Sequence, residues 1–333
     1  MATTAERIRW IRRRSEQHLE ALYLDRLLTP RCRRAHPSLD VDRTVTLMAS
    51  RRGGSTWVQE LLSSGPGVCP LFEPLFGTWY RRRHGLGVVP LPRPGQEAPE
   101  LEQFLREVMA GRRLTPMLRR LCDTPELLAA DQFLVKHVRL SLAAGWLLER
   151  FPRSPMVLLV RHPCAVVESL ERVRWGPDTV EQALSEVPPV EQDQVRQLVG
   201  DRPTTVGVLA GIWAVEVRAL LDQTTPATAH LLTYEAVCAD PVGVLGPVME
   251  AVGLPRPPDL AVLAARPSET TGSDSVVRTH GDPVRAWLDR MDPRARDEVL
   301  AVAAAAGVPG YSRDPLPDEA ALRERHAEPP TFT

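Results

Sequence analysis

Residues 44–62 read TVTLMASRRGGSTWVQELL, and this segment indicates how the chain folds. Its first part, Thr44–Ala49, is a run of β-branched and apolar residues that is typical of a buried strand. A loop with two glycines follows, and the apolar residues after Thr56 then recur at the spacing of a helix. The segment is therefore expected to form a strand, a glycine loop and a helix.

Three more short apolar runs are candidate strands: Gln132–Lys136, Met156–Val160 and His230–Thr233. They alternate with segments that have helix signals, among them Val206–Leu221, Pro241–Val252 and Arg294–Ala306. This alternation predicts an α/β fold, with a P-loop-like central parallel β-sheet flanked by helices on both faces. The proline-bearing stretch Pro177–Pro203 is expected to be an irregular or partly helical insertion over the sheet.

The composition is that of an ordinary globular protein. The 333 residues are 43% hydrophobic and 25% charged, and the formal net charge is −1, so nothing favours a nucleic-acid partner. No segment reaches the roughly 18 apolar residues of a membrane span, and no signal peptide is recognisable. The five cysteines are far apart and form no CxxC pair, so neither a metal site nor a disulfide framework is expected. These features predict a cytoplasmic protein in a reducing compartment.

One large domain is expected over residues 44–314, because nothing resembling a linker divides this part of the chain. Residues 1–43 precede it as an N-terminal helical segment, with an amphipathic helix from Ala5 to Leu28 whose expected role is packing. The alternative for this basic helix is contact with a membrane surface or an acidic partner. Residues 315–333 are expected to form a last helix and a loose tail.

The glycine loop is a candidate anion site. At the start of a helix several backbone N–H groups point at one spot, with the positive end of the helix dipole behind them. Gly53 and Gly54 would let an anion approach the backbone closely, Ser55 and Thr56 add hydroxyl donors, and Arg52 adds a fixed charge. A simple turn is the alternative. A Walker A loop is not favoured, because no lysine follows the glycines.

A second anion site is expected after Met156–Val160, where the chain continues as RHPCAVVESL from Arg161. Pro163 suits the first turn of a helix. Arg161 would then end the strand and Ser169 would lie about two turns into the helix, so both could reach one phosphate at the carboxyl edge of the sheet. Taken alone, a surface arginine and an exposed serine would be the simpler interpretation.

Together the two motifs resemble those of the sulfotransferases that use 3′-phosphoadenosine-5′-phosphosulfate (PAPS). SRRGGSTW resembles the family's 5′-phosphosulfate loop, and RHPCAVVESL resembles its 3′-phosphate motif, RDPRAVxxS. Cytosolic members usually have lysine where this chain has Arg52, so the likeness is nearer to the carbohydrate-type and bacterial members. The resemblance implies the sulfotransferase fold, PAPS as co-substrate, adenosine-3′,5′-bisphosphate (PAP) as product, and as cofactor-binding residues Arg51, Arg52, Gly53, Gly54, Ser55, Thr56, Trp57, Arg161 and Ser169.

In that family a basic, glycine-containing loop before a tryptophan folds over the 3′-phosphate of the nucleotide. The segment Val276–Trp287, VVRTHGDPVRAW, is the counterpart here. The resemblance implies that Arg278 and Gly281 contribute to cofactor binding. An ordinary surface loop is the alternative.

The resemblance also implies catalytic residues. Sulfuryl transfer leaves charge on the departing oxygen, and Arg52 is the expected stabiliser of that charge. Glu73, in LFEPL, is the expected base, because carbohydrate-type members carry a similar Glu-Pro segment. His137 is the rival, since cytosolic members use the histidine of a Lys-x-His arrangement. Here Lys136 and His137 are adjacent, so the two side chains should face opposite sides of the strand. Lys136, the only lysine of the chain, then binds sulfate or the acceptor.

The expected reaction is in-line transfer of the sulfuryl group of PAPS to a hydroxyl of a carbohydrate, a lipid or a small metabolite, with no metal. A non-catalytic module that binds a phosphonucleotide or a sulfated glycan is the alternative from another class. The run Arg81–Arg83 would suit an anionic acceptor, although a solvated charged run is the simpler interpretation.

Overall fold

In the computed structural model, the chain is described over residues 19–37, 40–76, 91–172, 180–185, 187–268 and 281–331. Parallel strands within these ranges form one five-stranded sheet in the order β2-β3-β1-β4-β5. The strands are β1 (Val45–Ala49), β2 (Val68–Leu71), β3 (Gln132–His137), β4 (Met156–Val160) and β5 (His230–Thr233). The predicted parallel α/β sheet is therefore confirmed.

β4 and β5 have the predicted bounds, and β1 and β3 differ from the prediction by one residue. β2 is the strand that the sequence does not predict. It has four residues, contains Pro70 and lies at the edge of the sheet. A proline is tolerated there because an edge strand needs fewer ladder hydrogen bonds. The same proline interrupts the apolar pattern by which a strand is recognised in the sequence.

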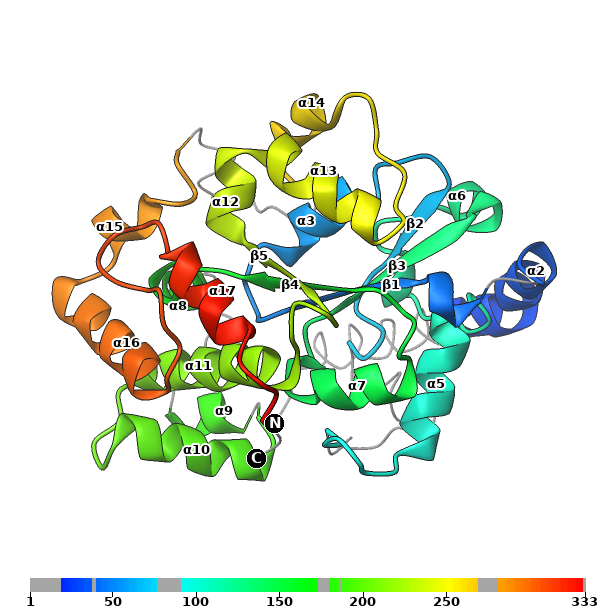
Figure 1. Cartoon of the computed structure of the whole chain (residues 1–333). Coiled ribbons are helices and arrows are strands. Elements are labelled where there is room, and N and C mark those ends of the chain that lie inside the picture. Colours follow the sequence, from blue (N-terminus) through cyan, green and yellow to red (C-terminus); the bar gives the residue numbers. More distant parts are fainter. Residues whose placement is uncertain are drawn as a thin grey trace, which may run out of the picture.

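Helices cover both faces of the sheet (Figure 1). One face carries α3 (Ser55–Leu62), α12 (Tyr234–Ala239), α13 (Pro241–Ala251) and α14 (Leu260–Ala264). The other carries α5 (Pro99–Met109), α7 (Ala144–Arg150), α8 (Pro163–Arg172) and α11 (Thr205–Gln223). The alternation of β1 supplies both cores: Leu47 packs in the cluster of α3, and Met48 packs in that of α5 and α7. The result is a three-layer arrangement.

The insertion predicted to lie over the sheet packs elsewhere. Within Pro177–Pro203 the structure forms α9 (Val180–Leu184) and α10 (Pro189–Val199), which confirms a partly helical segment. Both helices pack against the outer side of α11, where Val195 of α10 shares a cluster with Val208 and Ile212. α11 is apolar around most of its surface, so it can bury one side toward the sheet and another toward this insertion.

The remaining helices lie around these layers. α16 (Pro293–Ala305) packs on α11 and α8, and α15 (Ala286–Arg290) packs on α8. The last helix, α17 (Glu319–His326), falls inside the predicted C-terminal segment. The others are α6 (Thr124–Ala129) and the short turns η2 (Val41–Arg43), η3 (Met117–Arg119) and η4 (Ser141–Ala143).

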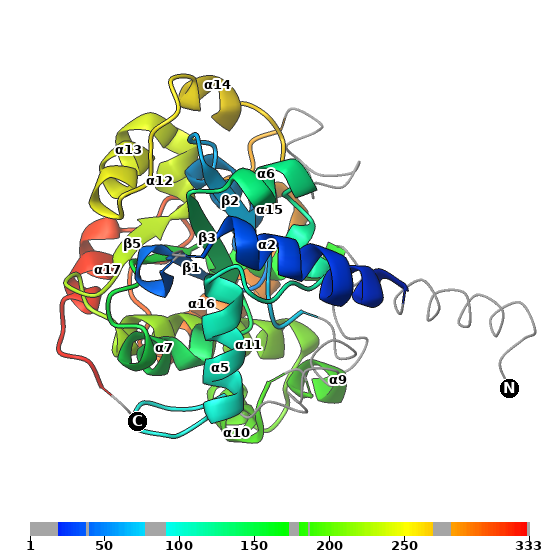
Figure 2. The same cartoon turned by 90° about the vertical axis from the view of Figure 1, so that its right-hand side faces the viewer.

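The N-terminal helix is described from Leu19 onward, so most of the predicted span Ala5–Leu28 lies outside the described residues. The helix runs past Leu28, through η1 (Leu24–Leu28) into α2 (Thr29–Ala35). α2 lies beside α6 along one side of the molecule (Figure 2). Leu24 and Leu28 are buried in the cluster of α5, which fits a packing role, whereas Leu19, Leu22 and Leu27 are exposed.

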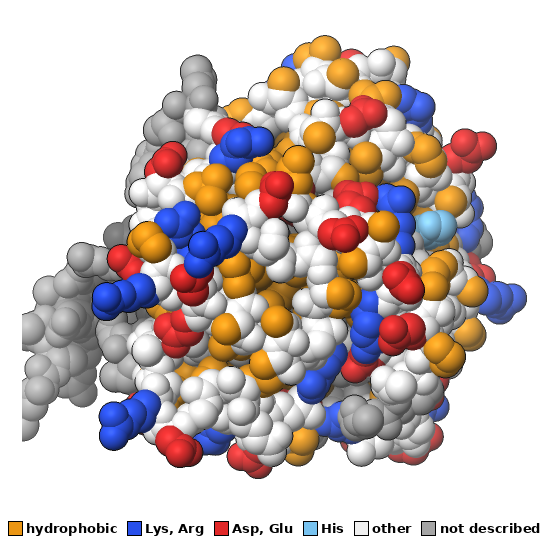
Figure 3. Space-filling view, turned by 60° about the vertical axis from the view of Figure 1, so that its left-hand side comes forward, with side chains coloured by type: hydrophobic (Ala, Val, Ile, Leu, Met, Phe, Trp, Pro, Cys, Tyr) orange, Lys and Arg blue, Asp and Glu red, His pale blue; other side chains and the backbone are white. Residues whose placement is uncertain are grey.

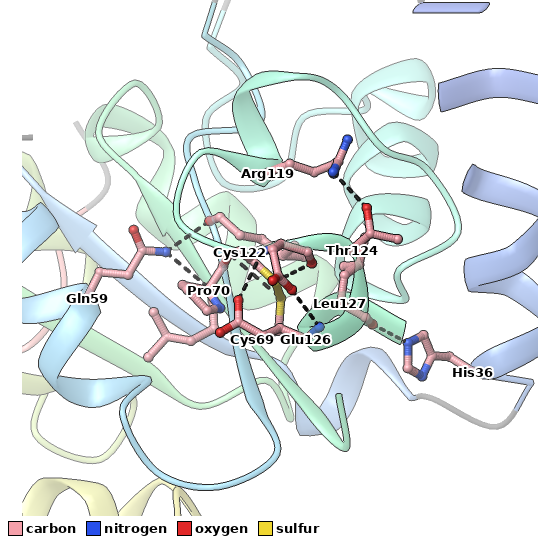
Figure 4. The surroundings of a disulfide bond; sticks show 12 residues. His36, Gln59, Cys69, Pro70, Arg119, Cys122, Thr124, Glu126 and Leu127 are labelled. Carbon is pink, nitrogen blue, oxygen red and sulfur yellow. Dashed lines mark hydrogen bonds between the residues drawn. A yellow bond between two sulfur atoms is a disulfide. The ribbon is translucent and has the colours of Figure 1, made fainter. Parts of the chain in front are cut away.

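The expectation of no disulfide is wrong. A disulfide joins Cys69 of β2 to Cys122, which follows η3 (Figure 4). The two Cα atoms are 6.3 Å apart although 53 residues separate the cysteines. They meet because the chain after α5 returns beside β2, where Phe72 N donates to Leu118 O at 3.1 Å. Linear spacing carries no information about such a return.

Three further findings concern membranes, metal ions and nucleic acids. Within the described ranges, no helix combines the length and the apolar character that a membrane crossing needs. In the same part of the chain no group of three or more His, Cys, Asp or Glu side chains is arranged to hold a metal ion. On the face in Figure 3, basic and acidic side chains are interspersed. That face therefore lacks the extended basic surface that nucleic acids bind.

Candidate active site

The loop after β1 has the backbone of an anion cradle. Arg52 has φ 57° and Gly54 has φ 82°, so the loop turns through the left-handed region twice before α3 begins at Ser55. Arginine at such an angle is strained, a cost that folded proteins retain most often at functional sites. No side chain caps the N-terminus of α3, which leaves the first N–H groups of the helix without a side-chain acceptor.

Gly54 is required for two reasons. Its positive φ suits glycine, and a Cβ atom there would lie 2.3 Å from the ring of Tyr234. At Gly53 a Cβ would lie 3.0 Å from Ser50 O, a tighter approach than most side chains make. Tyr234 in turn meets Trp57 edge to face, with ring centroids 5.6 Å apart. The end of β5 therefore closes the loop from the side of α12.

The two predicted anion motifs meet at this loop. Arg52 Nε donates to Ser169 Oγ of α8 at 3.0 Å, and Arg161, at the end of β4, donates from Nη1 to Arg52 O at 3.2 Å. The guanidinium of Arg161 lies 4.2 Å from the ring centroid of Tyr234, a cation–π contact. The sequence motifs assign no role to Tyr234. A tyrosine that directly follows the β5 run is the signal that could have found it.

The cations at this junction are crowded. Burial lowers the pKa of Arg52, and the charges of Arg161 and Arg172 lower it further, against the opposing effect of Glu168. Arg161 Nε is buried and donates to no partner in the described part of the chain. A bound anion would relieve both features, because it would pair with the crowded charges and accept from the free N–H. The junction is therefore suited to hold phosphate.

Lys136 and Glu73 lie on the other side of the loop. Lys136 Nζ donates to Thr56 Oγ1 of α3 at 2.9 Å and lies 3.3 Å from Glu73 Oε1. It also lies 3.6 Å from the ring centroid of Phe72. Its side chain is 1% exposed, and burial lowers its pKa to about 8, against the opposing effect of Glu73. A lysine titrating there is poised between its charged and neutral forms near neutral pH.

The turn that carries Glu73 is also strained, since Glu73 has φ 31°. It follows β2 at the carboxyl edge of the sheet, where Phe76 N donates to Glu73 O at 3.1 Å and closes the turn. The carboxylate is partly exposed, at 14% for the side chain. Glu73 is thus held at the loop and open on one side.

His137 lies away from this group. Leu134 packs on the α3 side of the sheet and Val135 on the α5 side, so Lys136 belongs to the α3 side and His137 to the α5 side. Burial lowers the pKa of His137 to about 3, and its Nε2 is buried with no partner among the described residues. The structure therefore does not bring His137 together with Glu73 and Lys136.

Some of the other predicted residues lie near the two anion motifs and others do not. Arg51 points toward α11, where its Nε lies 3.3 Å from Oε1 of the buried Glu216. Ser55 is buried at the first position of α3. Gly281 is exposed, and two residues later Pro283 O accepts from Arg161 Nη2 at 2.9 Å. Arg278 lies outside the described residues. The segment after Gly281 thus reaches the second anion motif.

His162 occupies the position of the aspartate in the motif RDPRAVxxS, and it packs against the segment that contains Trp287. Its ring stacks on Trp287, with centroids 4.5 Å apart. Nδ1 accepts from Cys164 N at 3.3 Å, so Nε2 carries the proton and donates to Ser312 O at 3.0 Å. Burial lowers the pKa of His162 to about 4, which agrees with a neutral ring. His162 is a packing residue of the site.

Solved structures of sulfotransferases are similar to this chain. The sulfotransferase domain of the Synechococcus olefin synthase is 18% identical, with a TM-score of 0.45, and the match covers 79% of this chain and 94% of that one. A mouse sulfotransferase complexed with PAP is 12% identical, with a TM-score of 0.44 and coverages of 84% and 93%. The sulfotransferase of Alicyclobacillus acidocaldarius is 15% identical, with a TM-score of 0.41 and coverages of 79% and 92%. No protein-family model matches the chain, and no curated protein sequence matches it significantly. At these identities the likeness concerns the fold.

Proposed function

We propose that the chain is a PAPS-dependent sulfotransferase that transfers the sulfuryl group to a hydroxyl of a carbohydrate, a lipid or a small metabolite. The observation that carries the proposal is the meeting of two cationic sites at one loop. Arg52 contacts both Ser169 and Arg161, and the Lys136–Glu73 pair lies beyond Thr56 of the same loop. PAPS carries a 3′-phosphate at one end and a 5′-phosphosulfate at the other, which is the charge distribution that such a pair of sites suits.

In this proposal the first turn of α3 and Arg52 hold the 5′-phosphosulfate. Arg161 and Ser169 hold the 3′-phosphate. When the sulfur–oxygen bond to the 5′-phosphate breaks, Arg52 stabilises the charge left on that oxygen, and the helix N–H groups assist. Lys136, fixed by Thr56, faces the oxygens of the sulfuryl group.

Glu73 is the proposed base. As the acceptor oxygen forms its bond to sulfur, the hydroxyl proton passes to the carboxylate of Glu73, and the sulfated product and PAP leave. A carboxylate suffices if the proton moves late, when the hydroxyl has become acidic. The 3.3 Å contact between Glu73 and Lys136 supports this choice over His137, which lies on the other face of the sheet.

The proposal is tested by transfer of labelled sulfate from PAPS to a panel of acceptors, together with direct binding of PAP. Arg52→Ala is expected to lower turnover on the order of a hundredfold or more, the scale seen when one preorganised donor is lost. Arg106→Ala is the matched control, because Arg106 is an exposed arginine on α5, paired with Glu102. Micromolar PAP binding without any transfer would favour the non-catalytic module instead.

The choice of base has its own test. Glu73→Gln is expected to lower turnover at every pH and to leave PAP binding unchanged, because the amide cannot accept the proton. His137→Ala is expected to keep turnover wherever the variant stays folded, which PAP binding reports. A loss of turnover in His137→Ala with intact PAP binding would transfer the role of base to His137.

Three predictions from the sequence remain proposals: the catalytic domain spans residues 44–314, Gly281 and Arg278 contact the nucleotide, and the protein is cytoplasmic. The Cys69–Cys122 disulfide is of a type that persists in oxidising compartments. The redox state of this pair in cells therefore tests the location directly. A fully reduced pair in intact cells fits the proposal, and a stable disulfide contradicts it.

A further inference from the structure

The order of the strands separates two sides of the loop after β1. Arg161 directly follows β4 and Ser169 belongs to α8, on the side of the proposed nucleotide site. Lys136 is the penultimate residue of β3 and Glu73 follows β2, on the opposite side. Ligands of parallel sheets bind outside the carboxyl ends of the strands. In the proposed function, the acceptor is therefore expected to bind at the carboxyl ends of β3 and β2.

Two aromatic rings frame Glu73 on this acceptor side, and each carries an arginine. The guanidinium of Arg139 lies 5.2 Å from the ring centroid of Phe76, and that of Arg120 lies 5.4 Å from the ring centroid of Phe72. Both arginines are exposed, whereas Phe72 is buried and Phe76 is half-buried. Stacking on a ring restricts a guanidinium and leaves its N–H groups available at the edge.

The nearby carboxylates are already matched to other cations. Glu73 pairs with Lys136, and Glu216 pairs with Arg51. Glu216 is buried, which raises its pKa, and the charges of Arg51 and, more weakly, Arg139 oppose that rise. Arg139 is thus close enough to sense Glu216, yet it forms no ion pair or hydrogen bond with it.

Glu60 is the other carboxylate that acts on this group, through its charge on Lys136. It lies on α3 and accepts from Ser268 Oγ at 2.9 Å. No acidic side chain within the described ranges pairs with Arg120 or Arg139. The acceptor side therefore carries positive charge that none of the described carboxylates neutralises.

We propose that the acceptor carries an anionic group and that Arg139 binds it. This inference rests on the proposed function and names the class of its acceptor. A carboxylate or phosphate on the acceptor would accept hydrogen bonds from the guanidinium N–H groups of Arg139 beside Phe76. The hydroxyl of the same acceptor would lie at Glu73 and Lys136. Arg120 adds to the attraction, since it lies over the ring of Phe72 and its charge acts on Lys136 of the same group.

The test uses pairs of probes in which one member carries an anionic group and the other a neutral group at the same position: 4-hydroxyphenylacetate and 4-hydroxyphenylacetamide, methyl β-glucuronide and methyl β-glucoside, and glucose 6-phosphate and glucose. Binding of each probe is measured by calorimetry on the free protein and on the protein saturated with PAP, so that no probe has to be turned over. Transfer from labelled PAPS is measured in parallel. The phosphate pair distinguishes a phosphate group from a carboxylate.

The charged member of at least one pair is expected to bind at least about tenfold more tightly than its neutral partner, the scale of a charge-assisted hydrogen bond. Arg139→Gln should abolish that preference and leave the affinity for PAP and for the neutral probes unchanged. Arg139→Glu should reverse it. Arg106→Gln is the matched control, because the guanidinium of Arg106, on α5, lies 5.1 Å from the ring centroid of Phe151. This variant should leave the charge preference and the affinity for PAP unchanged.

Three outcomes overturn the inference: no charge preference in the wild type, a preference that survives Arg139→Gln, or an equal loss for neutral and charged probes. Failure of the proposed function gives a different result: either PAP binds to neither the wild type nor Arg139→Gln, or PAP binds to both and no sulfate is transferred to any acceptor. A charge preference without PAP binding would keep the anion site and discard the sulfotransferase.

Discussion

Replacing Lys136 by methionine is predicted to stabilise the protein while it removes activity. Lys136 is 1% exposed, and burial lowers its pKa from 10.5 to about 8. A shift of this size corresponds to about 3 kcal/mol between the charged and neutral forms. Below pH 8 the lysine is charged in both the folded and the unfolded chain, so the whole cost of burying the charge opposes folding. Methionine fills a similar volume against Phe72 without that cost.

The pH dependence gives the prediction its signature. Between pH 8 and pH 10.5 the unfolded chain still holds the lysine proton and the folded chain has released it. The stability contributed by this group therefore rises with pH through that window and is lost again as the pH falls below it. The advantage of Lys136→Met should accordingly be up to about 3 kcal/mol at pH 7 and should shrink toward zero near pH 10.5.

The assay is urea unfolding of both proteins at pH 7, 9 and 10.5, with the difference between them as the readout, so that the titration of other groups cancels. In parallel, kcat/KM for PAPS in the wild type should fall above about pH 8, because the charged form of Lys136 is the one that stabilises the sulfuryl oxygens. A variant that is destabilised equally at all three pH values would refute the burial reasoning. An activity that rises through pH 8 would instead make neutral Lys136 the base.

Three further outcomes are expected. Gly54→Ala should destabilise the fold and abolish PAP binding, because the new methyl group would overlap the ring of Tyr234. A wild-type affinity for PAP, measured by calorimetry, would contradict the loop geometry. Tyr234→Leu should weaken PAP binding by roughly tenfold, since the ring no longer supports Arg161, and an unaltered affinity would remove this role. Reduction of the Cys69–Cys122 disulfide should lower the free energy of unfolding by about 4 kcal/mol, as the chain-entropy relation gives for a loop of this length. A Cys69→Ser variant should have the lower stability already and should not respond to the reductant.

The parts of the site that the sequence predicts are those written in a local pattern. The run Thr44–Ala49 determines the strand, because β-branched residues favour an extended backbone. The glycines after it determine the loop, because only glycine at position 54 suits both the positive φ and the close approach of the Tyr234 ring. Arg161 and Ser169 are likewise fixed by one strand and the helix that follows it. Their meeting with Arg52 follows from the adjacency of β1 and β4.

The parts of the site that the sequence does not predict depend on contacts between segments that are far apart along the chain. Cys69 and Cys122 become neighbours only because the segment after α5 lies beside an edge strand that its proline conceals. The pairing of Arg51 with Glu216 requires α11 to lie within reach of the loop, and the apolar sequence of α11 alone indicates burial without naming a partner. The arginines of the acceptor side likewise could not be predicted from a local pattern. Arg120, which contacts Phe72, and Arg139, which contacts Phe76, come from two segments far from these rings in the sequence.

The register of β3 links the local and the distant features. Lys136 and His137 are adjacent, and a strand sends adjacent side chains to opposite faces. On one face Lys136 meets Thr56 and Glu73, and on the other His137 is buried with its Nε2 unpaired among the described residues. A single residue of spacing thus decides which side chain can act at the loop. Glu73 lies beside Lys136 on that face, so the proposed choice of Glu73 over His137 as base follows from the geometry of the strand.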